Sequence, residues 1–369
     1  MLRRMAHEFA EKEIVPVAAE LDETAKFPHA IIAKAREVGL ININIPEAYG
    51  GMGATVLEEC IIAEELAWAC SGVSTAMTIN NLAAVPIKLA GSEEQRKHWL
   101  GRMIDGELGS YAVTEPDAGS DVAGMTAFAE KRGSEYILNG SKTFISNASE
   151  ASFFVVFART SREDRYGGIS CFIVERDRPG FSVSKKFDKL GQRCADTAEI
   201  SFSDLVIPEA NRLGPEGSGF LTAMKVFDCS RPTVSAAAVG VARRALEESL
   251  RYAQERAAFG QPIINFQAVS FMLADMAMNI DAGRLLAWQA AWLYDQGKPS
   301  SRHAAYAKAF CADMAMRATV DAVQIFGGYG FMKEYPVEKL MRDVKVFQIY
   351  EGTSQIQRVI IARELVKGR

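Results

Sequence analysis

One glutamate near the C-terminal end of the chain stands in a context that could support acid–base chemistry. Glu351 lies between the apolar pair Ile349-Tyr350 and Gly352. Gly352 can adopt backbone angles that end a helix, and Ser354 with Gln357 matches a capping box that opens the next one. Partial burial beside the apolar pair would raise the pKa of the Glu351 carboxyl toward that of a general base. A surface glutamate at a helix end is the alternative, and the local pattern alone favours it.

Two segments in the middle of the chain could contact a planar ligand. The segment Tyr111 to Asp121 reads as a strand end followed by small and hydroxylated residues, whose backbone N–H groups and hydroxyls a polar ligand could approach. Phe144 and Ser146 place an aromatic ring near a hydroxyl at a strand end, which suits the edge of a flavin, although a core phenylalanine is the simpler explanation. No G-x-G-x-x-G follows a strand, so Rossmann-type dinucleotide binding is disfavoured.

Three further motifs lie in segments with helical periodicity. Asp228 and Arg231 would share one helix face, as the members of a surface ion pair also do. The motif Arg256 to Gly260 begins with a cation at a predicted helix C-terminus, where it complements the helix dipole. The motif Gln324 to Gly328 ends in two glycines, which suit a helix stop. Taken singly, each motif has a purely structural explanation.

The composition is that of an ordinary globular protein. With 369 residues and 49% apolar content, the chain is long enough for two or three domains. A net charge of −4 with dispersed charges indicates neither a nucleic-acid-binding stripe nor a polybasic membrane tail. The six cysteines form no C-x-x-C pair, so we expect reduced core residues of a cytosol-like compartment. Only four histidines are present and none has ligand spacing, so no metal site is expected.

The N-terminal segment does not resemble a signal peptide. Met1 to Glu8 contains basic residues with no apolar region behind them, and no run reaches transmembrane length. The first helical pattern begins at Met1 without an N-cap residue ahead of Leu2, so we expect that the N-terminus is short or was cut. The expected location is the cytoplasm of a bacterium or, in a eukaryote, the mitochondrial matrix after removal of a targeting segment.

The hydrophobic period changes twice along the chain, which predicts an α+β protein. We expect an all-helical domain over 1–108, a β-barrel or sandwich domain over 109–213 and a helical bundle over 214–369. Strands are predicted at Thr126 to Lys131, Glu135 to Leu138, Ser141 to Ser146, Phe153 to Arg159, Ile169 to Glu175, Phe181 to Phe187 and Thr197 to Val206, with turns at Arg132-Gly133-Ser134 and Asn139-Gly140. Bundle helices are predicted at Phe220 to Ala257, Gln267 to Asp295, Ser301 to Ile325, Pro336 to Tyr350 and Ser354 to Val366.

Taken together, these motifs make the whole chain resemble the acyl-CoA dehydrogenase family, most closely its medium-chain, straight-chain members. The resemblance is carried by Tyr111 to Gly124, Gly191 to Cys194, Phe227 to Gly240, Arg256 to Gly260 and Gln324 to Arg358. It implies an N-terminal helical domain, a middle β-domain and a C-terminal four-helix bundle. It also implies that FAD and acyl-CoA bind between these domains in a homotetramer built as a dimer of dimers.

The resemblance also implies a role for each matched residue. The residues expected at the flavin are Tyr111, Val113, Thr114, Ser120, Phe144, Ser146, Thr353 and Gln355, and those expected to reach the adenine end from a neighbouring subunit are Arg256, Phe259, Gln324 and Gly328. The residues expected at the acyl-CoA are Ser120, Asp228, Arg231, Tyr350 and Gly352. Glu351 matches the base that removes the α-proton.

The implied activity is FAD-dependent α,β-dehydrogenation of a short- to medium-chain acyl-CoA to the trans-2-enoyl-CoA, with electrons passed to an electron-transfer flavoprotein. An enoyl-CoA reductase, an acyl-CoA oxidase and a dehydrogenase of branched or cyclic acyl-CoA stay open on the same fold. A nucleic-acid-binding or scaffold relative would predict a basic extra domain and a lost base, whereas this acidic chain keeps Glu351.

Four positions depart from the usual family pattern. Phe144 and Ser146 stand where Trp and Thr are frequent, and Ala258 replaces a hydroxyl residue. Thr78 stands at the expected floor of the acyl pocket, where medium-chain members often have Glu. Acyl-chain length and branching therefore stay open.

Overall fold

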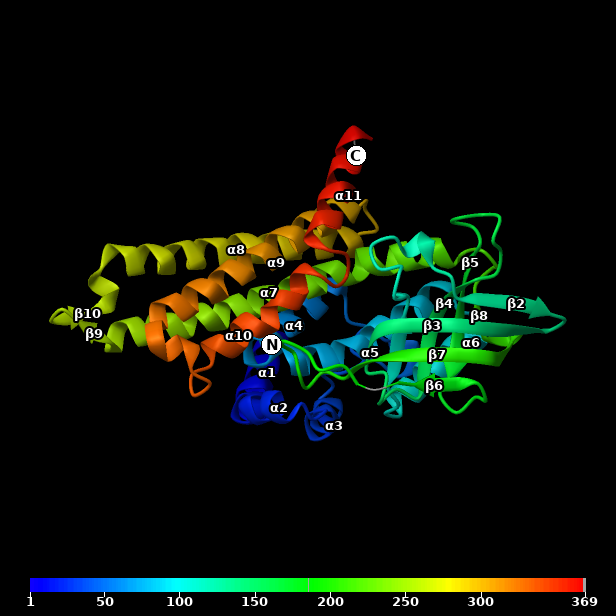
Figure 1. The fold of residues 1–369 in the computed structure, drawn as a ribbon, viewed down its shortest axis with the longest axis horizontal. Helices are drawn as coiled ribbons and strands as arrows, with labels where there is room; N and C mark the ends of the chain where they lie inside the picture. Colours follow the sequence, from blue (N-terminus) through cyan, green and yellow to red (C-terminus); the bar gives the residue numbers. More distant parts are fainter. Residues whose placement is uncertain (185, 368–369) are drawn as a thin grey trace.

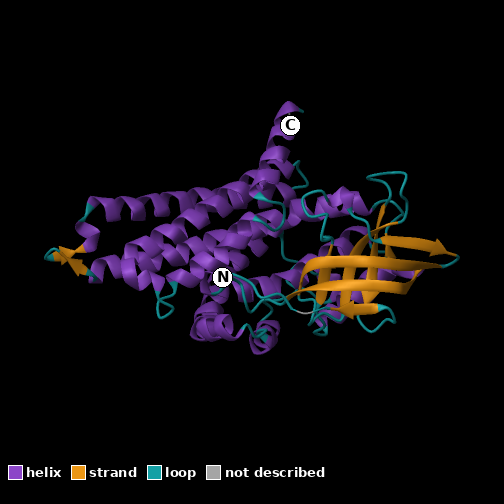
Figure 2. Cartoon of the chain, in the orientation of Figure 1, coloured by secondary structure: helices purple, strands orange, loops and turns teal. Residues whose placement is uncertain are grey.

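The structure, a computed structural model, describes residues 1–184 and 186–367. Helices come first along the chain, strands follow, and helices return (Figures 1 and 2). The N-terminal helices are α1 (Leu2–Phe9), α2 (Ala18–Thr24), α3 (His29–Glu37), α4 (Val56–Ala69), α5 (Ser71–Ala90) and α6 (Glu93–Ile104), with a π-turn at Ala10–Ile14 and 3-10 turns at Val15–Val17 and Glu47–Tyr49. Helices α4 and α6 both begin with a capping box.

The middle of the chain forms a sheet. Its strands are β1 (Gly109–Ala112), β2 (Phe128–Arg132), β3 (Glu135–Ser146), β4 (Phe153–Arg159), β5 (Ile169–Glu175), β6 (Phe181–Val183), β7 (Thr197–Pro208) and β8 (Arg212–Leu213). In the described part of the chain their order is β6-β7-β3-β2-β4-β5-β8, with β1 parallel beside β4. Strands β4 and β5 are buried on both faces and have the predicted bounds. The predicted strand Phe181 to Phe187 includes residue 185, which lies outside the described residues.

The predicted hairpin at Asn139-Gly140 is wrong. Strand β3 runs through both residues, and Gly140 adopts a φ of 134° where the register against β7 shifts. A Cβ on Gly140 would lie 2.8 Å from the Cα of Ala127, so the glycine permits a bulge rather than a turn. The physical reason is pairing on both sides: β2 and β7 both hydrogen-bond β3 and keep it extended. The turn predicted at residues 132–134 does connect β2 to β3.

The C-terminal helices are α7 (Gly219–Glu255), α8 (Gln267–Asp295), α9 (Ser301–Phe326), α10 (Val337–Val344) and α11 (Ser354–Val366). The long helices α7, α8 and α9 lie side by side, whereas α11 projects away from them (Figure 1). Helix α10 is shorter than the predicted Pro336 to Tyr350, because a 3-10 turn at Lys345–Gln348 follows it. Between α7 and α8, β9 (Ala257–Ala258) and β10 (Gln261–Pro262) form a hairpin at the end of the molecule opposite the sheet (Figure 1).

Helix α4 joins the N-terminal helices to the bundle. Ala63 and Ala67 of α4 belong to the same hydrophobic cluster as residues of α7, α8 and α9. A Cβ on Gly240 of α7 would lie 2.1 Å from the carbonyl oxygen of Glu64, so the glycine lets the two backbones approach this closely. The division at residues 108 and 213 stays a prediction.

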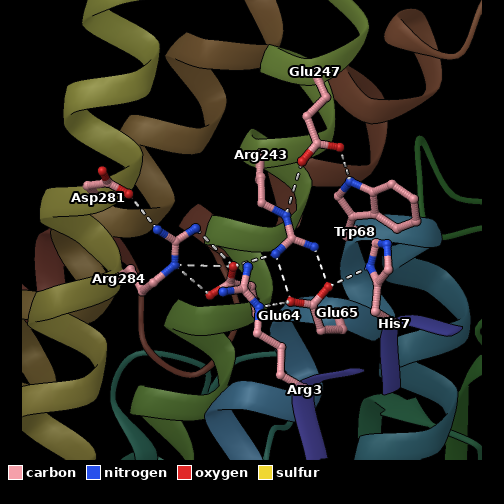
Figure 3. Close-up of polar contacts among 9 residues, drawn as sticks. All are labelled: Arg3, His7, Glu64, Glu65, Trp68, Arg243, Glu247, Asp281 and Arg284. Atoms are coloured by element: carbon pink, nitrogen blue, oxygen red, sulfur yellow. Dashed lines mark hydrogen bonds and ion pairs between the residues drawn. The ribbon is translucent and has the colours of Figure 1, made fainter. Parts of the chain in front are cut away.

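A buried network of charges crosses this α4–α7 contact (Figure 3). Arg243 of α7 pairs with Glu64 at 2.9 Å and also with Glu65. Arg284 of α8 bonds Glu64 at 3.0 Å, and Arg3 of α1 bonds Glu65 at 2.7 Å. Burial favours a high pKa for the Glu65 carboxyl, but the donors around it, chiefly Arg243, lower that pKa to about 2. Three helices of the network thus depend on two carboxylates of α4.

Two general features of the described residues complete the fold. All six cysteines are buried and unpaired, as the sequence predicts. No helix in the described ranges has both the length and the apolar content needed to cross a membrane.

Candidate active site

Glu351 lies at the corner between the 3-10 turn Lys345–Gln348 and α11. Its φ is 56° and that of Gly352 is 88°, so two consecutive residues adopt left-handed backbone angles. For a residue with a side chain this conformation costs on the order of 1–3 kcal/mol and persists only where the surroundings fix it. Here the Glu351 carbonyl oxygen accepts bonds from Arg231 Nε at 3.3 Å and from Gln357 Nε2 at 3.2 Å. The corner is therefore a strained backbone segment that other elements hold in place.

The capping box predicted for Ser354 and Gln357 is wrong. Helix α11 is capped one residue earlier by Thr353, whose hydroxyl accepts a bond from the backbone N–H three residues on at 3.1 Å. The Ser354 hydroxyl instead donates to Asp313 at 2.8 Å, and Gln357 turns back to the Gly352 carbonyl oxygen at 2.9 Å. The bond from Ser354 to Asp313 leaves Thr353 as the cap, and the residue pattern did not reveal that tertiary contact.

The Glu351 carboxylate is partly buried and has one direct hydrogen-bond donor. Ser230 of α7 donates to its Oε2 at 2.7 Å. Burial raises the pKa of the Glu351 carboxyl, and the bond from Ser230 and the charges of Arg231 and Lys308 partly oppose that rise. Lys308 is itself buried on α9, which lowers the pKa of its ammonium to about 8 even though Glu351 opposes that shift. The result is an oriented carboxylate with increased proton affinity, as a general base requires.

Asp228 and Arg231 form an ion pair one turn apart on α7. Their side chains lie 3.3 Å apart, and Arg231 is only 5% exposed, so this is not a pair on the open surface. The Ser301 hydroxyl also donates to Asp228. The guanidinium carbon of Arg231 lies 5.4 Å from the Phe227 ring centroid. These contacts fix the cation beside the Glu351 carbonyl.

Tyr111 connects the middle domain to this corner. Its ring centroid lies 6.3 Å from that of Phe227. Its hydroxyl is buried and has no hydrogen-bond partner among the described residues. Burial raises the pKa of the Tyr111 hydroxyl, and the nearby Glu351 charge raises it further. An unpartnered buried hydroxyl beside a carboxylate fits a site that a polar ligand completes.

The structure brings the two predicted flavin segments of the middle domain together. The backbone N–H of Thr143 donates to the Thr114 carbonyl oxygen at 2.9 Å, and Ser110 Oγ donates to the Ser146 carbonyl oxygen at 2.6 Å. Ser120 is exposed in the same loop. The chain segment that carries Thr114 therefore lies directly beside the end of β3.

A buried ion pair anchors that loop from behind. Lys142 Nζ lies 2.8 Å from Glu115 Oε1 and donates to the Val113 carbonyl oxygen at 3.0 Å. The other Glu115 oxygen accepts the Thr126 N–H at 2.6 Å. Burial lowers the pKa of Lys142 to about 8, and Glu115 opposes that shift. Because every polar group here has a partner, the loop backbone is fixed in advance of any ligand.

Phe144 offers an aromatic surface at this place. Its side chain is 64% exposed, its φ is 57°, and its ring centroid lies 5.3 Å from that of Phe187. A large exposed aromatic side chain in a strained backbone conformation is typical of a ligand contact. The exposed ring, the hydroxyls of Thr114 and Ser146 and the unpartnered Tyr111 hydroxyl fit a planar, polar-edged group such as a flavin.

Three other residues singled out in the sequence, Tyr350, Thr78 and Gln355, have different environments. Tyr350 is partly buried. Burial raises the pKa of its hydroxyl, while bonds from Gln192 and Thr75 oppose that rise. Thr75 Oγ donates to Gln192 Oε1 at 3.0 Å. Thr78 bonds its own helix, at 2.9 Å from the Ser74 carbonyl oxygen. Gln355 is exposed on α11.

Four predicted cofactor residues lie elsewhere in the chain. Twenty-five residues of helix separate Arg231 from Arg256, which corresponds to about 38 Å at the helical rise. Arg256 lies over the Tyr329 ring, 5.6 Å from its centroid, next to Gly328. Phe259 is 95% exposed at the hairpin tip. A single chain therefore brings Arg256 near Gly328 but leaves both, with Gln324 at the end of α9, far from Glu351.

Two residues that contact the Glu351–Gly352 corner were not found from the sequence. Ser230 directly precedes the predicted Arg231, but nothing in its local pattern indicates a bond to a residue 121 positions away. The sequence could have indicated that Lys308 has a buried partner. It is the one charged residue in the apolar run Ala304 to Ala312, and a buried lysine requires a partner. Its Nζ donates to the Gly352 carbonyl oxygen at 2.5 Å.

Three family descriptions match consecutive parts of the chain. They are the acyl-CoA dehydrogenase N-terminal domain over residues 1–107, the middle domain over 110–205 and the C-terminal domain over 217–366. The chain is 43% identical to an acyl-CoA dehydrogenase of Bacillus subtilis (strain 168), with 100% of this chain and 98% of the relative covered. It is 42% identical to a short-chain specific acyl-CoA dehydrogenase of Clostridium acetobutylicum, with 100% and 97% covered.

Solved structures of similar chains have the same fold. Butyryl-CoA dehydrogenase from Megasphaera elsdenii superposes with a TM-score of 0.96 at 40% identity, over 99% of this chain and 97% of that one. A chain in the structure of the electron transferring flavoprotein of Acidaminococcus fermentans gives 0.97 at 44% identity, over 100% and 97%. The FAD complex of PigA gives 0.95 at 31% identity, over 99% and 96%.

The fold and the matched domains define a flavin-dependent oxidoreductase. The chain belongs to the acyl-CoA dehydrogenase family. The predicted family and the predicted three-domain α+β architecture are thus confirmed, and dehydrogenation of an acyl-CoA is the general activity.

Proposed function

We propose that the protein oxidises a short- to medium-chain acyl-CoA to the trans-2-enoyl-CoA, with Glu351 as the base that removes the α-proton. The observation that carries this proposal is the environment of the Glu351 carboxylate. Ser230 orients it through a bond of 2.7 Å, and burial raises its pKa. The α-proton of a thioester is only weakly acidic, so its removal requires such a base together with donors to the carbonyl oxygen. We assign the backbone N–H of Glu351 as one of these donors.

We assign the flavin ring of FAD to the surface made by Tyr111, Val113, Thr114, Phe144 and Ser146. The exposed Phe144 ring and the buried, unpartnered Tyr111 hydroxyl support this assignment. When bound, FAD supplies the acceptor for the hydride that leaves the β-carbon. Ser120, Thr353 and Gln355 complete the set of cofactor residues, while Asp228, Arg231, Tyr350 and Gly352 lie on the acyl-CoA side.

We further propose a homotetramer in which Arg256, Phe259, Gln324 and Gly328 of one subunit reach the cofactor of another. An apolar stripe on α8 supports subunit packing: Phe271, Met278, Leu285 and Trp292 recur every seven residues and are 45–64% exposed. Such spacing presents one continuous helix face. An apolar hollow of about 520 Å³ adjoins it, lined by Leu285, Leu286 and Phe310 among others.

We propose an electron-transfer flavoprotein as the electron acceptor. The similarity to a chain in the electron transferring flavoprotein structure supports this partner. A comparison of that flavoprotein with oxygen as acceptor for the reduced enzyme tests the assignment, because an oxidase would turn over equally well with oxygen alone.

The decisive test is anaerobic bleaching of the flavin by a panel of straight, branched and cyclic acyl-CoAs. We expect a yellow protein that straight short- to medium-chain substrates bleach. The Glu351→Gln variant should bleach roughly 10²–10⁴-fold more slowly, which is the usual contribution of a general base, while calorimetric binding of acyl-CoA persists. An unchanged bleaching rate would place the base elsewhere. A protein that stays colourless after incubation with FAD would refute the cofactor assignment.

A further inference from the structure

Two cysteines and a lysine meet where the three parts of the chain join. Cys70 is the residue that precedes α5, Cys194 lies in the segment before β7, and Lys339 belongs to α10. Lys339 Nζ lies 3.3 Å from Cys70 Sγ, and Cys194 belongs to the same buried cluster of side chains as Cys70. Both cysteines are only 1% exposed. None of these side chains takes part in the acyl-CoA chemistry proposed above.

Several groups around Cys70 favour its thiolate. Cys70 is the N-cap residue of a 20-residue helix, where the helix dipole favours a negative charge. The neighbouring Cys194 thiol and the Lys339 ammonium lower the pKa of Cys70 to about 6, and burial opposes that shift. The neighbouring Cys70 sulfur and burial raise the pKa of Cys194, which stays a thiol.

The ammonium that faces the thiolate is itself fixed. Lys339 Nζ donates to Asp343 Oδ2 at 2.5 Å, one turn along α10. The second oxygen of Asp343 accepts the Gln192 backbone N–H at 2.6 Å, and Ser71 Oγ donates to Oδ2 at 3.3 Å. Lys189 also faces Cys194 from the same segment of the chain. The cluster is therefore preorganised and charge-balanced, which distinguishes it from cysteines that merely fill a core.

The four remaining cysteines differ from Cys70 in the direction of their pKa shift. Burial raises the thiol pKa of Cys60, Cys171, Cys229 and Cys311, so these remain protonated. The Cys194 sulfur packs closely against the first turn of α5, because a Cβ on Gly72 in that turn would lie 2.7 Å from Cys194 Sγ. Cys70 thus has an ammonium at 3.3 Å that favours its thiolate and a second thiol close by, which are two features of a peroxide-reactive pair.

We propose that Cys70 and Cys194 form a peroxide-reactive dithiol, an oxidative modification site separate from the acyl-CoA site. The Cys70 thiolate attacks one peroxide oxygen: an S–O bond forms, the O–O bond breaks, and the leaving hydroxide takes a proton to become water. The Cys194 sulfur then attacks the Cys70 sulfenic acid: an S–S bond forms, the S–O bond breaks, and hydroxide leaves with the thiol proton as a second water. Overall, two thiols are oxidised and one peroxide is reduced to two waters.

The first experiment treats the FAD-loaded, full-length enzyme with hydrogen peroxide and maps disulfides by mass spectrometry after alkylation and trypsin digestion. Cys60 and Cys70 share the tryptic fragment between Arg36 and Lys88, so a Cys60→Ala background assigns the linkage. We expect a linked peptide that joins Cys70 to Cys194, loss of two thiols, and recovery of both with dithiothreitol. A full thiol count after peroxide treatment, or a linkage through any other cysteine, would overturn the proposal.

The second experiment tests the proposed division of roles. In a Cys194→Ala variant the Cys70 sulfenic acid has no resolving thiol, so dimedone should label Cys70. Lys339→Met should slow disulfide formation about tenfold by reducing the thiolate fraction, whereas Lys339→Arg should react near the wild-type rate. Retained flavin absorbance confirms that each variant is folded, and the dimedone experiment does not depend on Lys339. Dimedone on another cysteine, or on none, would refute Cys70 as the nucleophile.

Discussion

At the scale of single residues, the proton affinity of Glu351 is set by opposing influences. Burial raises the pKa of its carboxyl, whereas Ser230 donates a hydrogen bond to Oε2 and so favours the charged form. Arg231 and Lys308 act in the same direction as Ser230 through their charge. The hydroxyl is therefore the part of this balance that a single substitution can remove without removing a cation.

Replacing Ser230 with Ala should raise the pH at which flavin reduction reaches half its maximum. The proposed base works in its deprotonated form, so the rate should rise with pH through the Glu351 pKa, and loss of a bond to the carboxylate moves that pKa upward. A hydrogen bond to a charged group corresponds to a shift of roughly 1–2 pH units. Stopped-flow bleaching across a pH series measures the shift. Ser235→Ala is the matched control, because its hydroxyl bonds the Arg231 carbonyl at 2.7 Å on the same helix; an equal shift there would refute the role of Ser230.

The sequence predicted the backbone corner at Glu351 better than the contacts around it, and the role of Glu351 as the base stays a prediction. A carboxylate before a glycine can be recognised locally, and the positive φ of Gly352 follows from its lack of a side chain. The bond from Ser230 depends on how α7 lies against a corner 121 residues away, and no local pattern encodes that register. The capping box failed for a related reason, since Thr353 and Ser354 are both good caps and only the tertiary bond from Ser354 to Asp313 separates them.

At the scale of elements, the buried charges between α4 and α7 link stability to pH. The pKa of Glu65 lies near 2 in the folded protein, well below its ordinary value of 4.5. A depressed carboxyl pKa contributes stability that is fully present above about pH 4.5 and is lost as the pH falls toward 2. The contacts of Figure 3 thus weaken in acid, when Glu65 becomes protonated and Arg243 loses one of its charged partners.

Replacing Glu65 with Gln should destabilise the protein by about 3–5 kcal/mol at pH 7, because Arg243 would be left buried beside a neutral amide. Urea unfolding at a series of pH values measures the difference from the wild type, and we expect that difference to shrink as the pH falls from 5 toward 3. Glu8→Gln is the control, since Glu8 belongs to an exposed pair with Arg4 and should change stability by less than about 1 kcal/mol. A stability difference that does not vary with pH would show that Glu65 acts through packing alone.

Elements whose bounds follow from their own residue pattern were predicted well, whereas the element whose bounds depend on strand pairing was not. Strands β4 and β5 are buried on both faces, so their continuous apolar runs gave the correct bounds. Helix α8 begins and ends where the sequence indicates. The dipeptide Asn139-Gly140 is typical of a hairpin turn. Strand β3, however, pairs with both β2 and β7, and it forms more backbone hydrogen bonds by continuing than by turning.

At the scale of the whole molecule, the apolar stripe on α8 leads to a prediction about assembly. Leu285 is 64% exposed at the centre of the stripe and borders the apolar hollow. Leu285→Asp would bury a charge in the proposed helix–helix interface and should dissociate the proposed tetramer. Sedimentation velocity should show smaller species, while the circular dichroism of the subunit is retained. Leu221→Asp alters an equally large residue that is 59% exposed on α7 outside the stripe. A tetramer that persists in Leu285→Asp but not in Leu221→Asp would place the interface elsewhere.

The length of α7 has a further consequence for the proposed assembly. Arg231 lies in the N-terminal half of the helix and Arg256 caps its C-terminal end, so each flavin site would take its base from one chain and its adenine contact from a second. A chain with Glu351→Gln would still lend an intact hairpin to its neighbour, and a chain with Arg256→Ala would still offer an intact base. When the two variants assemble together, some sites combine Glu351 from the Arg256→Ala chain with Arg256 from the Glu351→Gln chain. Mixed oligomers would therefore show intragenic complementation, with activity that neither homogeneous parent possesses.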